Sequence, residues 1–134
     1  MTLRRKSREF ALQMLFEWDM TRQEPSRVEK LFWKSARAAE STRDFANELF
    51  EGTVAQAGEI DAMVAKLAEN WRLDRLAAID RNILRLGIYE MRAGTAPPRV
   101  IIDEALELAK KFSSAEAPAF LNGVLDAALK NFAT

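Results

Sequence analysis

The sequence predicts an all-α protein, a compact bundle of six or seven helices. Apolar residues recur at helical spacing over most of the 134 residues, whereas alternation of period two is absent and β-branched residues are sparse. Helix-breaking residues are few, with 5 Gly and 4 Pro. The chain is 49% hydrophobic and 30% charged, which is the composition of a globular protein long enough to bury one core.

The first predicted helix covers residues 4–20 and is amphipathic. At about 100° per residue, its apolar side chains gather on one side and its polar side chains on the other. The side expected to face the core carries Ala11, Leu12, Leu15 and Trp18. The side expected to face solvent carries Lys6, Glu9, Gln13 and Glu17.

The next segment predicts two or three helices. Ser26 and Glu29 have the spacing of a capping box, which predicts a second helix over about 26–39. A third helix is predicted within 43–67. Gly58 indicates a bend in it, so that the last part of this range counts as a separate helix.

The second half of the chain predicts three further helices. They cover about 76–93, 100–112 and 120–132. Gly94 is a good C-terminal cap for the first of them. Ser113 and Glu116 have the spacing of a second capping box before the last helix.

We expect one domain over residues 1–134. A connector at 70–73 divides it into helical subdomains of about 1–69 and 70–134. Neither half alone would bury enough apolar surface, so the two are expected to share one cooperative core.

Composition excludes several kinds of chemistry. The chain has no Cys and no His, which removes disulfides, thiolate chemistry and the commonest metal ligand and general base. The carboxylates show no spacing suited to an acid–base pair, so we expect neither an enzyme nor a bound cofactor. No apolar run is long enough to span a membrane, and the charged N-terminus does not resemble a signal peptide, so a cytoplasmic location is expected.

The positive charge of this chain is local. Arg4, Arg5, Lys6 and Arg8 (hereafter the basic cluster) fall within the first eight residues, whereas the whole chain balances 20 Lys and Arg against 20 Asp and Glu. Such a cluster is a candidate for binding a phosphate backbone. The alternative is a solvated terminus.

Arg8 has a further alternative. On a helical wheel it continues the apolar stripe of its helix, and Glu90 does the same in the helix over 76–93. A buried carboxylate needs a partner, and Arg8 is one candidate.

Three blocks, in their order and spacing, resemble the NusB family of bacterial transcription antitermination factors. They lie at residues 5–16 (RKSREFALQMLF), within 70–91, and within 98–126, where PRVIIDEALELAKKF is followed by FLNGVLD. The resemblance implies two three-helix bundles with a shared core. It also implies binding of boxA RNA together with NusE, a small-subunit ribosomal protein, within the RNA polymerase antitermination complex of ribosomal RNA operons.

The resemblance also implies roles for individual residues. The basic cluster matches the family's arginine-rich RNA-binding element. Phe120 is expected to stack on a base and Asn122 to hydrogen-bond RNA, although core packing of Phe120 and close helix packing at Asn122 are the alternatives. Asp80 and Glu116 match acids that the family directs toward NusE, and Glu116 is equally explained as a capping acid.

This sequence departs from the family pattern at three positions. Ser113 replaces a usual Gly, Asp103 a usual Asn and Phe16 a common Tyr. Two other functions stay open: a helical protein–protein adaptor, and a detached NusB-like domain of a ribosomal RNA methyltransferase, although nothing in the sequence suggests a site for a methyl donor.

Overall fold

The computed structural model describes residues 3–67 and 76–132, and in these ranges the chain forms six α-helices and no strand. The helices are α1 (Leu3–Thr21), α2 (Pro25–Ser35), α3 (Glu40–Leu67), α4 (Ala78–Ala93), α5 (Pro98–Phe112) and α6 (Ala117–Phe132). The all-α prediction is confirmed. Within the described part, no helix is long and apolar enough to cross a membrane. The connector at 70–73 and the boundary between the two predicted subdomains lie outside the described residues.

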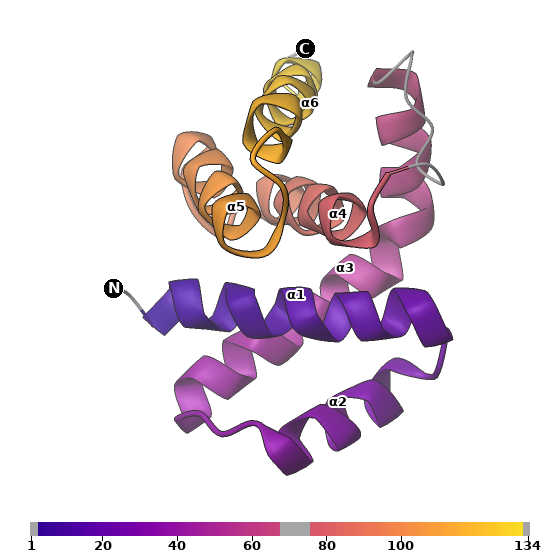
Figure 1. Cartoon of the computed structure of the whole chain (residues 1–134), viewed down its shortest axis with the longest axis vertical. Helices are drawn as coiled ribbons and strands as arrows, with labels where there is room; N and C mark the ends of the chain where they lie inside the picture. The colour runs from indigo at the N-terminus through magenta and orange to yellow at the C-terminus, as the bar shows by residue number, and fades with distance from the viewer. Residues whose placement is uncertain (1–2, 68–75, 133–134) are drawn as a thin grey trace.

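Helix α1 lies across the middle of the molecule (Figure 1). Helix α2 packs on one side of it, and α4, α5 and α6 gather on the other side. The long helix α3 crosses α1 and continues beside α4, so it contacts both groups. Buried apolar side chains from all six helices form one continuous cluster.

The apolar face of α1 is buried as predicted. Ala11, Leu12, Leu15 and Trp18 are at most 8% exposed. The prediction was wrong for Glu9, which is only 4% exposed although it lies on the polar side of the helical wheel. The reason is that α5 approaches this side, and the Lys111 Nζ lies 2.9 Å from the Glu9 Oε1.

Gly94 ends a helix, whereas Gly58 lies within one. Gly94 takes the left-handed conformation with φ 69°, and its N–H donates to the Glu90 carbonyl at 2.8 Å, so it caps α4 as predicted. The prediction of a separate helix after Gly58 was wrong, because α3 runs through this residue without a break. The core-facing stripe keeps its phase across this point, with Ala57 and Ile60 both buried, and packing outweighs the weak helix propensity of one glycine.

Helix α2 begins without the predicted capping box. Its N-cap is Glu24, which makes no side-chain cap hydrogen bond, and Pro25 follows at the first helical position, where a fixed φ favours helix. Glu29 instead lies near Glu51 of α3, and its Oε2 is buried without a hydrogen-bond partner. Burial, and after it the nearby Glu51 carboxylate, raise the pKa of Glu29 to about 8.

The second predicted capping box was also wrong. Ser113 ends α5 in an extended conformation with φ −125°, so replacing the family's usual glycine there introduces no strain. Its hydroxyl donates to the Asp80 Oδ1 at 2.5 Å instead of capping α6. The N–H of Ala117, where α6 begins, donates to the Ser114 carbonyl at 3.2 Å.

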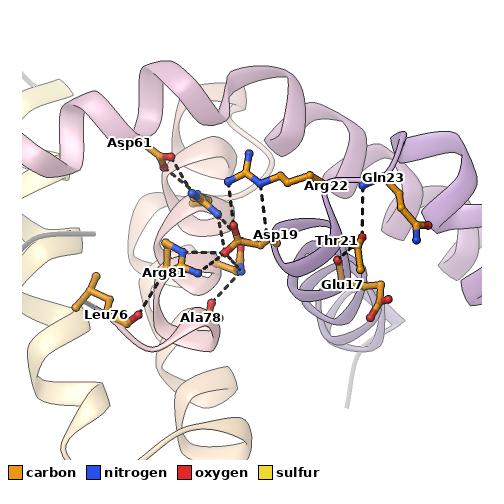
Figure 2. Close-up of polar contacts among 11 residues, drawn as sticks. Glu17, Asp19, Thr21, Arg22, Gln23, Asp61, Leu76, Ala78 and Arg81 are labelled. Atoms are coloured by element: carbon orange, nitrogen blue, oxygen red, sulfur yellow. Dashed lines mark hydrogen bonds and ion pairs between the residues drawn. The ribbon is translucent and has the colours of Figure 1, made fainter. Parts of the chain in front are cut away.

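A polar network fixes the C-terminal end of α1 (Figure 2). The Asp19 carboxylate accepts from the Arg81 Nε at 2.8 Å and pairs with the Arg85 Nη1 at 3.2 Å, while Arg85 also binds Asp61 of α3 through two bonds of 2.8 Å. Figure 2 shows Arg22 approaching the same carboxylate. Burial alone would raise the pKa of Asp19, but the hydrogen bonds and charges of Arg81 and Arg85 outweigh it and lower that pKa. The network therefore stabilises the fold at neutral pH and is lost as the pH falls.

Two glycines of α3 provide a matched pair for testing the packing. A Cβ at position 52 would overlap the ring of Tyr89, whereas a Cβ at position 58 would meet nothing within 4 Å. We expect Gly58→Ala to raise the free energy of unfolding by about 0.5–1 kcal/mol, because alanine is the better helix former. Gly52→Ala should lower it by about 1–3 kcal/mol through overpacking. Urea titration measures both, and an equal change in the two variants would contradict this packing.

The Glu29–Glu51 contact predicts a pH dependence of stability. The folded state holds the Glu29 proton more tightly than the unfolded chain does, so this group's contribution is fully present below about pH 4.5 and is lost as the pH rises toward 8. We expect Glu29→Gln to be more stable than the wild type at pH 9, by about 1 kcal/mol after solvent screening, and equal to it near pH 4.5. Thermal melting across this range measures the difference. Glu17→Gln, an exposed carboxamide change on α1, should show no such trend.

Candidate nucleic-acid interface

The basic cluster lies in the first two turns of α1, and the structure divides its members by exposure. Arg4 and Lys6 are exposed, the Arg5 side chain is 37% exposed, and the Arg8 side chain is 4% exposed. In Figure 1 the start of α1 lies beside α5, with the first turns of α3 on its other side. The four cations therefore face different neighbours.

Arg8 forms a buried ion pair with Glu90 of α4, as its place on the apolar stripe suggested. Its Nε donates to both carboxylate oxygens, at 2.9 and 3.1 Å, and its Nη2 donates to the Oε1 at 2.8 Å. The Thr95 hydroxyl donates to the same Oε1 at 2.7 Å. Because the guanidinium is enclosed and its fork is occupied, this arrangement does not present Arg8 to a phosphate, contrary to the expected direct contact. Arg8 instead holds the start of α1 on α4.

Arg5 binds Glu104 of α5 in a bidentate manner. The Nε and Nη2 donate to the two carboxylate oxygens at 3.0 and 2.6 Å. The hydrogen bonds from Arg5 hold the pKa of the Glu104 carboxyl below its usual range, against the opposing effect of burial. One edge of the Arg5 guanidinium is thus already paired, and an RNA phosphate must share or replace Glu104 there.

Two lysines near Arg5 were missed by the sequence reasoning. A cavity of about 260 Å³ beside the start of α1 is lined by Arg5 and Glu9 of α1 and by Lys110, Lys111 and other residues of α5. The lysine side chains are 62% and 54% exposed. The signal available in the sequence was two adjacent cations in the last turn of the helix over 100–112, a position that is equally explained by the helix dipole.

Arg4 and Lys6 lie over aromatic rings. The Arg4 guanidinium carbon is 4.2 Å from the centroid of the Phe45 ring of α3, and the Lys6 Nζ is 5.1 Å from that of Phe10. The Lys6 Nζ is also 3.6 Å from Glu9. These contacts are weak at exposed positions, so both side chains can turn toward a phosphate at little cost.

Phe120 and Asn122 lie in the first turns of α6. Phe120 is half-buried and packs partly against the core, which fits the packing alternative as well as a ring at the edge of a binding surface. Asn122 is exposed. Figure 1 shows α5 between the start of α1 and α6, so an RNA that contacts both the basic cluster and this pair must pass over α5.

Asp80 and Glu116 lie where the start of α4 meets the connection between α5 and α6. Asp80 lies half-buried in the first turn of α4 and accepts the hydroxyl hydrogen bond of Ser113. Glu116 is exposed in the same α5–α6 connection. The two carboxylates therefore belong to one region, at which only Glu116 is fully available to a partner.

Among residues 3–67 and 76–132, no group of three or more Asp and Glu side chains is arranged to hold a metal ion. The charged groups around the start of α1 are instead paired with each other across helices, as Arg5 is with Glu104 and Lys111 with Glu9.

The sequence matches one protein family over nearly its whole length. The NusB family model matches residues 5–130. A transcription antitermination protein NusB from Koribacter versatilis is 49% identical over 125 residues, which cover 92% of this chain and 86% of that protein. The protein of the same name from Solibacter usitatus is 46% identical, with coverage of 95% and 88%.

Solved structures agree with the sequence match. A crystal structure of the antitermination factors NusB and NusE in complex with dsRNA contains a chain with a TM-score of 0.88 and 28% identity, with 98% of each chain covered. The solution structure of NusB from Aquifex aeolicus gives a TM-score of 0.86 at 29% identity and covers 99% of this chain and 91% of that one. Taken with the helical architecture and the basic start of α1, these matches show that the chain belongs to the NusB family.

Proposed function

We propose that this protein is a transcription antitermination factor that binds boxA-type single-stranded RNA together with NusE. In this role it acts in the cytoplasm, within the RNA polymerase complex that reads through terminators in ribosomal RNA operons. The role is one of binding and not of catalysis. The observation that carries the proposal is the basic cluster, held at a defined place on the surface by the buried pair of Arg8 with Glu90.

In the proposed complex, Arg4, Arg5 and Lys6 contact the RNA backbone. Arg4 and Lys6 are exposed and only weakly held, and Arg5 borders a cavity that also carries Lys110 and Lys111. Basic side chains on phosphates supply most of the non-specific affinity for nucleic acid. Arg8 contributes as a positioning residue.

Sequence preference then comes from groups that contact bases. Phe120 is proposed to stack on one base and Asn122 to hydrogen-bond another group of the same RNA. The half-exposed position of Phe120 and the exposed position of Asn122 are compatible with these contacts.

Of the other functions, the methyltransferase domain is the less supported. The relatives that this chain matches over 86% and 88% of their own length are named transcription antitermination protein NusB. The RNA-binding test below distinguishes a simple helical adaptor from an RNA-binding protein.

The first test compares charge removal at two places. We expect Arg4→Ala with Arg5→Ala to weaken binding to boxA-type RNA and to lower the salt slope by about 0.7 for each phosphate that is no longer neutralised. Fluorescence anisotropy at several salt concentrations measures both, with a scrambled RNA alongside. Lys130→Ala, on an exposed side chain near the end of α6, is the matched control. An unchanged slope in the double variant, or equal binding of scrambled RNA, would contradict the proposal.

One further variant in the same experiment is expected to change the RNA affinity in the opposite direction. Glu104→Gln removes the charge that pairs with Arg5 and keeps a hydrogen-bond acceptor of nearly the same shape. It should therefore strengthen RNA binding several-fold, because the phosphate no longer competes with a carboxylate.

The second test concerns the protein partner. We propose that Glu116 and Asp80 serve NusE, since ribosomal proteins are generally basic and an acidic surface would steer association. Glu116→Lys should slow association with NusE several-fold at low salt, and Asp80→Asn, which keeps an acceptor for Ser113, should slow it less. Binding of RNA alone should be equal or stronger. Stopped-flow mixing measures the rates, Glu40→Lys at the start of α3 is the control, and rates equal to the control would show that the acidic surface lies elsewhere.

A further inference from the structure

A second cavity lies on the other side of the basic cluster, between the first turns of α1 and α3. Its volume is about 440 Å³, and its lining includes Arg4, Ser41, Asp44, Phe45 and Glu48. Ser7 and Thr42 also line it, and the Ser7 hydroxyl donates to the Thr42 carbonyl at 2.8 Å, which joins α1 to α3. Arg4 therefore borders both the proposed path of the RNA backbone and this cavity.

Phe45, the aromatic residue of this cavity, contacts both the core and a cation. It packs partly against the hydrophobic core, and the Arg4 guanidinium lies over its ring, 4.2 Å from the ring centroid. A cation–π contact at an exposed position is weaker than the stacking of a nucleobase on an aromatic ring. A base can therefore replace Arg4 on the ring, or stack with it, while Arg4 turns toward the adjoining phosphate.

The acidic members determine which part of a nucleotide fits. Asp44 and Glu48 are four residues apart on α3, so they lie on one face of that helix, and both are exposed. Among the described residues, neither carboxylate takes part in an ion pair with a Lys or Arg side chain. Two negative charges disfavour a phosphate inside the cavity, but they accept hydrogen bonds from the amino group of a base, as Asp and Glu do from cytosine.

We propose that this cavity is a subsite for one unpaired nucleobase that bears an amino group. The base stacks on Phe45 and donates to Asp44 or Glu48, and its own phosphate lies outside, against Arg4. Adenine, cytosine and guanine satisfy this arrangement, whereas uracil lacks the amino group. The inference rests on the proposed RNA-binding function and adds a base-reading element on α3 to it.

The test is a double-mutant cycle between the protein and the RNA. The variant Phe45→Leu keeps an apolar side chain against the core and removes the stacking face, and circular dichroism checks that it folds. The RNA is a boxA-type single strand, together with a set in which one nucleotide at a time is abasic or replaced by uridine. Phe132→Leu, on a ring 38% exposed at the end of α6, is the control variant.

We expect Phe45→Leu to weaken binding of the unmodified RNA about tenfold, within the range for loss of one base stack. The loss should vanish for the RNA that is abasic at one particular position, because the interaction is then already absent. Uridine at that position should weaken binding to the wild type but not to Asp44→Ala with Glu48→Ala, because that variant has lost both acceptors for the amino group.

Two failures are distinguishable. If Arg4 and Arg5 variants lower the salt slope but Phe45→Leu behaves as Phe132→Leu on every RNA, the subsite is wrong and the RNA-binding function stands. If boxA-type and scrambled RNA bind alike and neither responds to the basic cluster, both proposals are overturned.

Discussion

The buried ion pair between Arg8 and Glu90 determines where the start of α1 lies. The two side chains are 4% and 2% exposed, and the arginine donates three hydrogen bonds to the carboxylate. Removing two charges from water is costly, and the cost is offset only when the geometry satisfies both groups. A small rotation of α1 would leave a charge buried without its partner. The cations at positions 4, 5 and 6 are therefore presented in directions set by this pair.

Buried charge also holds the opposite end of α1. Asp19 and Arg85 have side chains only 3% exposed, and the network reaches Asp61 on α3. Between the two ends, α1 contributes a fully buried apolar stripe to the core. Hydrophobic burial supplies most of the stabilisation, but it is not directional. The two polar networks supply the direction, and the result is a rigid platform for the exposed residues at the start of α1.

The basic cluster is charged but not unpaired. Arg5 lies against Glu104, Arg4 covers Phe45, and Lys6 is near Glu9. In the proposed function, RNA binding is an exchange, in which phosphates replace internal carboxylates and bases replace cations on a ring. Each exchange lowers the affinity for a polyanion that offers only phosphates, because an internal interaction must first be broken. An RNA that offers both phosphates and suitably placed bases replaces more of the broken interactions and loses the least affinity. The internal pairing therefore favours specific RNA over non-specific RNA.

The sequence by itself determined the apolar stripes, most of the helices and the cap at Gly94, because each is encoded in local periodicity or in a helix-ending residue. It placed Arg8 and Glu90 on apolar stripes and so made Arg8 one candidate partner, but the packing of α1 on α4 decided that the two form a pair. The tertiary structure alone decided that α3 continues through Gly58, since the packing of buried residues on both sides of it keeps the helix unbroken. It alone brought Glu104 to a cation 99 positions earlier in the chain. Such contacts depend on how helices cross, and helix crossings are set by the shapes of side chains that a one-dimensional pattern does not contain.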